Sequence, residues 1–200
     1  AAKRTSANVI NVDLENSATK KNESIIDTMQ TLKAMQIDMF VIRHKQNGLP
    51  HLVAESIDDV SILNAGDGVN AHPTQALLDM LSIRQHNKNF EEISVAIVGD
   101  IVHSRVAHSG IQALKTLGTT DIRLIAPPPL QYNDVDSSSI SCYEDIELGL
   151  KDCDVVMMLR LQKERMIEAD IPNESEYFDS FGLNSERLSL AKPDAIVMHP

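Results

Sequence analysis

Apolar and polar residues alternate along the chain in short blocks that have the lengths and periods of strands and helices. Runs rich in β-branched and other apolar residues predict strands. They cover residues 7–12, 39–43, 60–63, 94–98, 122–126, 155–159 and 195–198. Segments of helical character cover residues 23–35, 50–55, 73–86, 104–117, 143–151 and, from a cap at 184 or 185, the stretch to 191. Strands that alternate with helices predict parallel sheets with helices on both faces.

The alternation restarts near residue 91, after the polar stretch 87–90. We therefore predict an α/β protein with two lobes, each a parallel sheet with helices on both faces. The expected domains are residues 1–87, which include a linking helix over 73–86, and residues 91–200. In open sheets of this kind ligands bind beyond the carboxyl ends of the strands. Polar residues at strand ends are therefore the first candidates for a functional site.

Composition narrows the classes of partner. The chain has 200 residues and a formal net charge of −11, which argues against nucleic acid because such binding needs a basic surface. No apolar run is long enough to cross a bilayer. Two cysteines are too few for a disulfide framework and fit a reducing cytoplasm, and the histidines and cysteines lack zinc-ligand spacing, so we expect no metal. An anionic substrate would have to be held by local arginines against the field of the whole protein.

The glycine-punctuated loop over residues 64–71 runs into a predicted helix at His72-Pro-Thr-Gln75. Gly66 and Gly68 allow the loop to turn sharply, and proline suits the first turn of a helix. A helix start has free N–H groups and a positive dipole end, which attract anions. His72 and Gln75 lie one turn apart on one face. Two interpretations stay open at this point: a site for a small oxygen-rich ligand, or a polar loop that caps a core helix.

Further cationic and amide side chains lie at or near strand ends: Arg43, Arg105, Arg160 and Gln162. The planar fork of arginine grips a carboxylate or phosphate with two hydrogen bonds. The plainer alternatives are a surface arginine at position 43 and a salt bridge between Arg160 and one of the many acidic residues. Gly99 is not followed by a Gly-x-Gly-x-x-Gly fingerprint, and the chain has neither a Gly-x-Ser-x-Gly elbow nor a Walker loop. These absences argue against a dinucleotide enzyme, an α/β-hydrolase and a P-loop enzyme.

Four groups of residues, in this order, resemble the aspartate carbamoyltransferase family within the aspartate/ornithine carbamoyltransferases. They are Val41-Ile-Arg-His44, Asn64-Ala-Gly-Asp-Gly68 with His72-Pro-Thr-Gln75, Val98-Gly-Asp-Ile-Val-His-Ser-Arg105 and Met158-Leu-Arg-Leu-Gln-Lys-Glu-Arg165. Each motif alone is weak, but together they are specific and span essentially the whole chain. The chain resembles the middle of such an enzyme, starting after the family's Ser-Thr-Arg-Thr phosphate loop and ending at His199-Pro200. We expect this segment to need that loop for activity.

The resemblance implies transfer of a carbamoyl group from carbamoyl phosphate to the amino group of L-aspartate, an early step of pyrimidine synthesis. It implies carbamoyl-phosphate contacts from Arg43, His72 and Gln75, and catalytic roles for Arg43 and His72. It implies aspartate contacts from Arg105, Arg160 and Gln162, and from Lys21, which relatives lend to the neighbouring subunit of a homotrimer. From the residues alone, Lys21 is a solvated lysine in a charged loop. No cofactor is expected.

Two alternatives remain open. An ornithine carbamoyltransferase shares the His-Pro-Thr-Gln core, but its amino-acid loop is of the Ser-Met-Gly type, whereas this chain has Leu159-Arg-Leu-Gln162. Arginines suit the second carboxylate of aspartate better than the ammonium group of ornithine. The other alternative is a non-catalytic, carbamoyltransferase-like binding or assembly subunit. A regulatory or dihydroorotase-like partner subunit is possible in this family, whereas neither nucleic acid nor a membrane is expected.

Overall fold

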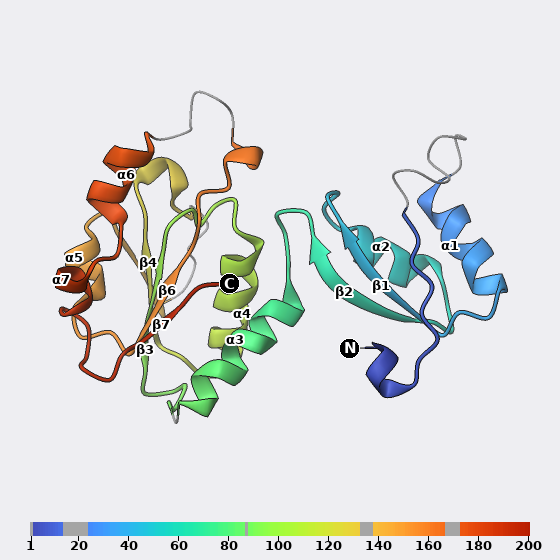
Figure 1. The fold of residues 1–200 in the computed structure, drawn as a ribbon, viewed down its shortest axis with the longest axis horizontal. Coiled ribbons are helices and arrows are strands. Elements are labelled where there is room, and N and C mark those ends of the chain that lie inside the picture. Colours follow the sequence, from blue (N-terminus) through green and yellow to red (C-terminus); the bar gives the residue numbers. More distant parts are fainter. Residues whose placement is uncertain (1, 14–23, 87, 133–137, 167–172) are drawn as a thin grey trace. The chain divides into compact units, whose positions relative to one another are not determined.

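The computed structural model describes residues 2–13, 24–86, 88–132, 138–166 and 173–200. The chain divides into two compact units, which Figure 1 shows. The first unit contains residues 1–42 and 48–63, and the second contains residues 43–47 and 64–200. No helix in the described ranges has the length and apolar character needed to cross a membrane.

The first unit contains most of strand β1 (Met39–His44), the start of strand β2 (Ser61–Asp67) and helices α1 (Ile25–Ala34) and α2 (Leu49–Ser56). The last residues of both strands belong to the second unit. The strands run in the same direction, because Ser61 N donates to Asp38 O at their start and Gly68 N donates to His44 O at their end. Alternate residues of β1 are buried. They join a core of Met29, Phe40, Ile42, Leu49, Val53 and Ile57, to which both helices contribute.

Helix α1 begins where the sequence supplies a capping box. Asp27 N donates to Ser24 Oγ at 3.1 Å, and Ser24 N donates in return to Asp27 Oδ2 at 3.3 Å. Two free N–H groups of the helix start are satisfied in this way. The helix predicted over residues 23–35 is therefore confirmed over Ile25–Ala34.

The strand predicted over residues 7–12 is wrong. This segment follows a short 3₁₀ helix (Ala2–Thr5) and has no regular structure. Val9, Ile10 and Val12 are 46%, 59% and 42% exposed. β-Branched residues favour a strand only where a neighbouring strand pairs with the backbone and a core covers one face. In the described part of the first unit no strand pairs with this segment and no core covers it. The preference of its residues for a strand therefore has no effect.

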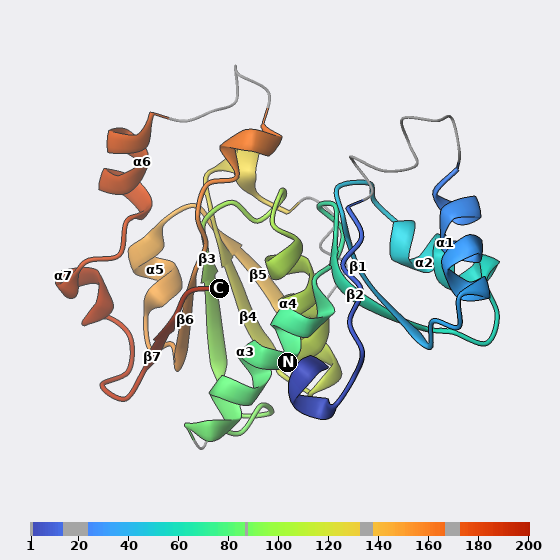
Figure 2. The same ribbon diagram turned by 45° about the vertical axis from the view of Figure 1, so that its right-hand side comes forward.

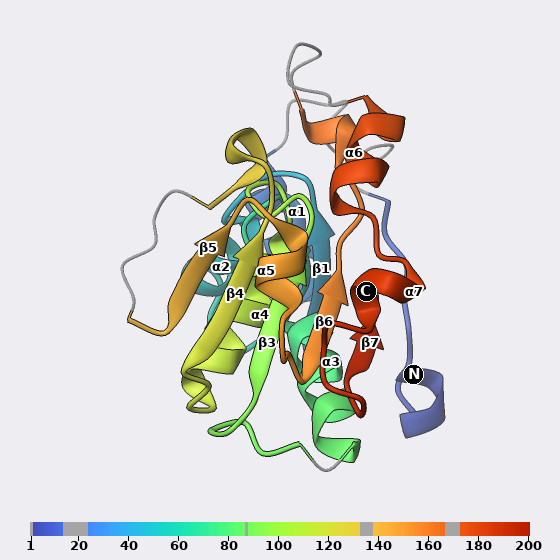
Figure 3. The same ribbon diagram turned by 90° about the vertical axis from the view of Figure 1, so that its left-hand side faces the viewer.

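The second unit contains a five-stranded sheet in the order β5-β4-β3-β6-β7, and every pair of neighbours is parallel. The strands are β3 (Ser94–Val98), β4 (Asp121–Ile125), β5 (Ile140–Tyr143), β6 (Val155–Met158) and β7 (Ile196–Met198). Central strand β3 pairs Val95 with Ile122 on one side and with Val155 on the other. Figure 3 shows the sheet face on, with its order visible from β5 to β7.

Helices cover both faces of this sheet. Val95 and Ile97 point to one face and pack with α3 (Pro73–Gln85) and α4 (Arg105–Thr116). Ala96 and Val98 point to the other face and pack with residues of α5 (Ile146–Leu150), α6 (Glu174–Phe181) and the segment after α7 (Ser185–Leu188). Figures 1 and 2 show the two helical layers on either side of the strands. All five residues of β3 are buried, as expected for a parallel strand with both faces covered.

One strand and one α-helix of the second unit are absent from the sequence prediction. Strand β5 carries a mixed pattern, Ile-Ser-Cys-Tyr, with its middle residues exposed, because it lies at the edge of the sheet. Tyr143 therefore ends a strand instead of starting the helix predicted over 143–151. That helix begins later, at Ile146, where Asp145 accepts from the N–H groups of Glu147 and Leu148. Helix α6 was also missed, and β2 continues past residue 63 into the glycine loop as far as Asp67.

Candidate active site

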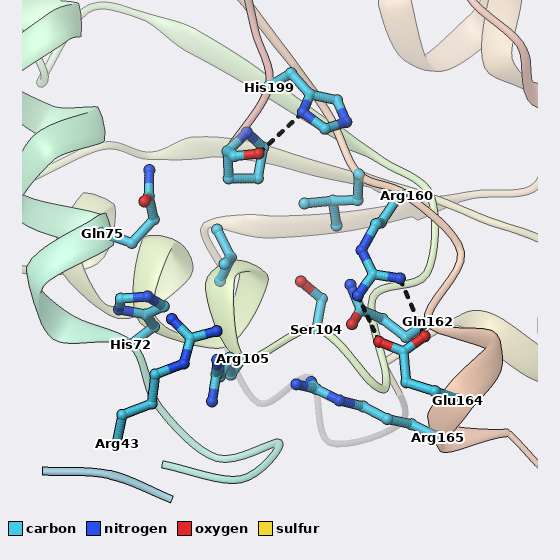
Figure 4. A pocket seen from close by; sticks show the side chains of 13 residues that line it. Arg43, His72, Gln75, Ser104, Arg105, Arg160, Gln162, Glu164, Arg165 and His199 are labelled. Atoms are coloured by element: carbon cyan, nitrogen blue, oxygen red, sulfur yellow. Dashed lines mark hydrogen bonds and ion pairs between the residues drawn. The ribbon is translucent and has the colours of Figure 1, made fainter. Parts of the chain in front are cut away.

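A cavity of about 320 Å³ lies in the second unit, where the segments after β3, β6 and β7 meet the starts of helices α3 and α4. Its wall is formed by Arg43, His72, Gln75, Ser104, Arg105, Val106, Leu159, Arg160, Gln162, Glu164, Arg165, His199 and Pro200. Figure 4 shows Arg43, His72 and Arg105 together at one end and Arg160, Gln162 and Glu164 at the other, with Ser104 between. The cavity lies at the carboxyl edge of the sheet, where open α/β sheets bind ligands.

The structure brings together nearly all of the residues singled out in the sequence. Arg43, His72, Gln75, Arg105, Arg160 and Gln162 all line this one cavity, although they come from segments that are more than a hundred residues apart. Lys21 lies outside the described residues. The cavity also contains residues that the sequence did not single out, among them Ser104, Glu164 and Arg165.

Two helix starts face the cavity. His72 is the N-cap residue of α3, and Pro73 occupies the first turn. The His72 ring forms no cap hydrogen bond; its backbone N–H donates to Ser109 Oγ at 2.8 Å instead. Helix α4 is capped by Ser104, whose Oγ accepts from Ala107 N at 3.2 Å. The side chain of His72 is thus not used to cap α3, and both helices direct their positive ends toward the same space.

Positive charge is concentrated around His72. Burial lowers the pKa of His72, and the nearby guanidinium groups of Arg105 and Arg43 lower it further. The pKa of Arg105 is also lowered, first by burial and then by Arg43 and Arg165, whereas Asp67 opposes this effect. The imidazole is therefore held in its neutral form, and cations that repel one another are gathered beside it. An anion bound among them would relieve this repulsion.

The glycine loop holds Arg105. Arg105 Nη1 donates to Gly68 O at 3.3 Å. Gly66 has a φ of +141°, and a Cβ atom added there would lie 2.8 Å from Arg105 Nη1. A side chain at position 66 would therefore be strained and would occupy the space of the guanidinium group. The sharp turn predicted for this loop therefore brings its backbone close to an arginine of the cavity.

At the other end, Arg160 is bound by Glu164, four residues further on. Arg160 Nη1 donates to Glu164 Oε2 at 3.1 Å, and Nη2 bonds the second carboxylate oxygen. Both side chains are about half exposed. The hydrogen bonds from Arg160 lower the pKa of Glu164 to about 2. The salt bridge considered for Arg160 in the sequence therefore exists, and the arginine lines the cavity as well.

Asp100 organises this wall from below the surface. It is fully buried and directly follows the sharp turn at Gly99. Its Oδ2 accepts from Gln162 N at 3.0 Å, and its Oδ1 lies 2.8 Å from His103 Nδ1. Arg165 Nη1 in turn donates to His103 O at 2.8 Å. In the sequence, Asp100 stands out only as an acidic residue directly after the glycine that follows a strand. Its role follows from these contacts in the structure.

Comparison with known proteins assigns both halves of the chain. Residues 1–85 match the family model for the carbamoyl-P binding domain of aspartate/ornithine carbamoyltransferase, and residues 91–200 match the model for the Asp/Orn binding domain. The chain is 78% identical over 200 residues to the aspartate carbamoyltransferase catalytic subunits of Vesicomyosocius okutanii subsp. Calyptogena okutanii (strain HA) and of Ruthia magnifica subsp. Calyptogena magnifica. These matches cover 100% of the chain and 62% of each relative. The chain thus spans less than two thirds of these proteins.

Solved structures agree with this assignment. The fold matches a crystal structure of aspartate transcarbamoylase from Trypanosoma cruzi in complex with carbamoyl aspartate and phosphate, with a TM-score of 0.84 and 31% identity. That match covers 100% of this chain and 66% of the other. The same enzyme in complex with carbamoyl phosphate and aspartate matches with a TM-score of 0.78 and 30% identity, over 99% and 66% of the two chains.

Proposed function

The chain belongs to the aspartate/ornithine carbamoyltransferase family, and on this premise we propose that the complete protein transfers a carbamoyl group from carbamoyl phosphate to the amino group of L-aspartate. The products are N-carbamoyl-L-aspartate and phosphate. One observation carries the proposal: Arg43, Arg105, Arg160 and Arg165 share one cavity in a chain with a net charge of −11. Such a local reversal of charge suits two anionic substrates bound side by side.

The two ends of the cavity suggest how the substrates divide it. Arg43, His72 and Gln75 form the carbamoyl-phosphate end, where a neutral His72 beside Arg43 can donate to the carbonyl oxygen as negative charge develops on it. Arg105, Arg160 and Gln162 bind the carboxylates of aspartate. Holding the amine next to the activated carbonyl carbon supplies much of the rate, since a bimolecular step becomes intramolecular. The departing phosphate accepts the amine proton.

The arginines also favour aspartate over ornithine as the acceptor. A second carboxylate matches the guanidinium groups of Arg160 and Arg165, whereas an ammonium group in their place would be repelled. The proposal further includes a cytoplasmic enzyme of pyrimidine synthesis, active as a homotrimer in which Lys21 completes the site of the neighbouring subunit. A regulatory or dihydroorotase-like partner would associate outside the cavity described here.

The proposal is tested with the full-length protein that contains this chain. We expect phosphate release that requires both carbamoyl phosphate and L-aspartate, together with formation of N-carbamoyl-L-aspartate. Arg105→Ala should lower kcat/KM for aspartate by at least about tenfold, the loss that one charge-assisted hydrogen bond represents. Arg84→Ala, at an exposed arginine of α3, is the matched control and should change nothing. Turnover with L-ornithine and none with L-aspartate would contradict the proposal.

A further inference from the structure

One buried carboxylate beside the cavity has no role in the reaction as described so far. Asp79 lies on α3 one turn after Gln75, and only 5% of the residue is exposed. Gln75 Nε2 donates to Asp79 Oδ1 at 2.9 Å. The second oxygen, Oδ2, is buried without a hydrogen-bond partner among the described residues. Among the described residues, Gln75 alone forms a hydrogen bond with the Asp79 side chain.

The carboxylate is unfavourable for the fold itself. Its neighbours on the buried face of α3 are apolar: Ala76, Met80 and Ile83. Burial raises the pKa of Asp79, and the hydrogen bond from Gln75 opposes this shift. A buried oxygen without a partner costs free energy that a neutral or apolar residue would not cost. A contribution to function would explain an ionisable group at this position better than a contribution to stability does.

We propose that Asp79 is a positioning residue that orients the Gln75 carboxamide, with the nitrogen toward Asp79 and the oxygen toward the cavity. The nitrogen of the amide faces Asp79, because Gln75 Nε2 donates to Asp79 Oδ1. In its ionised form the carboxylate can only accept hydrogen bonds, and it therefore favours the NH₂ side of the amide. The amide oxygen and nitrogen diverge from the same carbon, so with Nε2 bound to Asp79 the Oε1 atom remains for the cavity that Gln75 lines (Figure 4). Without Asp79 the two orientations of the amide would differ much less in energy.

This orientation has a consequence for substrate choice, which rests on the proposed function. The guanidinium groups of Arg43 and Arg105 can only donate hydrogen bonds. Gln75 Oε1 adds an acceptor beside these donors, and an acceptor there recognises an N–H group carried next to a phosphate. Carbamoyl phosphate has such a group, whereas acetyl phosphate has a methyl group in its place. Asp79 would therefore help the site to select the carbamoyl compound.

The test compares Asp79→Asn with wild type in the full-length protein, by calorimetric binding of carbamoyl phosphate and of acetyl phosphate. Asparagine has nearly the same shape, but it can accept or donate, so the orientation of Gln75 is no longer enforced. We expect affinity for carbamoyl phosphate to fall about tenfold, the loss of one hydrogen bond, while affinity for acetyl phosphate changes less than about twofold. The melting temperature should stay the same or rise. Asp58→Asn, at an exposed position, is the control.

A double variant distinguishes the positioning of Gln75 by Asp79 from a general disturbance of the cavity. In a Gln75→Ala background, Asp79→Asn should have no further effect on binding, because the amide that it orients is gone. Equal losses for both phosphates, or unchanged discrimination, would overturn the role of Asp79. Failure of the proposed function looks different: the wild-type protein would then show no carbamoyl transfer to aspartate, whatever residue occupies position 79.

Discussion

At the scale of single residues, the site is made from ordinary side chains whose properties are set by their neighbours. His72 illustrates this. Burial and two guanidinium groups lower its pKa, so the ring is neutral where an exposed histidine would be partly charged. A neutral imidazole can donate from one nitrogen without bringing a further positive charge into a cavity that already contains several arginines.

The first prediction concerns this ring. His72→Ala in the full-length enzyme should lower kcat by roughly 10²–10³, the effect of removing one donor to a developing oxyanion. The melting temperature should change little, because the His72 ring caps no backbone N–H of α3 and its contact with that helix is one hydrogen bond, to Thr74 Oγ1 at 3.3 Å. Steady-state kinetics and thermal unfolding measure the two quantities. Normal turnover with a lowered melting temperature would instead indicate a structural role.

The second prediction follows from the lowered pKa. Folded protein binds a proton at His72 less readily than the unfolded chain does, so this group contributes stability above pH 6.5, the ordinary histidine value. That contribution is lost as the pH falls from there through the folded-state pKa. Arg105→Gln should raise the pKa of His72 part of the way back, because burial remains. An NMR titration of the ring checks this, and an unmoved titration curve would contradict the assigned cause.

The third prediction concerns Arg160. Arg160→Ala should lower kcat/KM for aspartate by about 2 kcal/mol, or roughly thirtyfold, while binding of carbamoyl phosphate stays close to normal. The physical reason is loss of a cationic hydrogen-bond donor from the end of the cavity that we propose for aspartate. Arg84→Ala again serves as the control. If kcat/KM for aspartate is unchanged, the role of Arg160 is limited to its salt bridge with Glu164.

At the scale of elements, loops and helix starts place these side chains. Near its end, β2 turns at Gly66 to pass close to Arg105, and the turn at Gly99 allows the end of β3 to approach Leu159 beyond β6. Neither approach leaves room for a side chain: a Cβ atom at Gly99 would lie 2.7 Å from Leu159 O. Backbone geometry therefore decides where the cationic groups can converge.

The fourth prediction uses two glycines of the second unit. Gly66→Ala should displace the Arg105 guanidinium group and strain the loop, so that kcat/KM for aspartate falls and the melting temperature drops. Gly110→Ala is the matched control. Position 110 lies inside α4 with nothing within 4 Å of an added Cβ, so this change should stabilise the protein by about 0.5–1 kcal/mol. Equal behaviour of the two variants would contradict the explanation.

At the scale of the whole molecule, we propose that each active site is shared between two subunits. Lys21, outside the described residues, is the residue that we propose to cross to a neighbouring subunit of a homotrimer. In a ring, every junction repeats the same interface, so each site would combine residues from two chains.

The fifth prediction tests that sharing. Full-length Lys21→Ala and Arg43→Ala variants should each be nearly inactive as pure trimers. Mixing and reassembling them should restore part of the activity, because some junctions then contain both residues intact. Native mass measurement verifies that mixed trimers form. Mixed trimers with no more than the summed residual activity of the parents would place Lys21 in its own subunit or outside the site.

The sequence by itself determined those elements whose apolar pattern is strong and local. Strand β3 lies where five apolar or small residues predicted it, α1 has the expected apolar face and cap, and α4 begins next to Ser104. The candidate residues at strand and helix ends could also be named, because parallel strands bring their carboxyl ends to one edge. The fold class follows from the alternation of these elements.

Tertiary structure decided what depends on distant partners. The segment 7–12 pairs with no strand of the described ranges and stays exposed, whereas the weakly apolar β5 is a strand because β4 pairs with it. Asp100 reaches Gln162, sixty-two positions away, and the salt bridge of Arg160 selects Glu164 from many acids. Local propensity amounts to only fractions of a kcal/mol per residue, so pairing, burial and charge supplied by remote segments prevail.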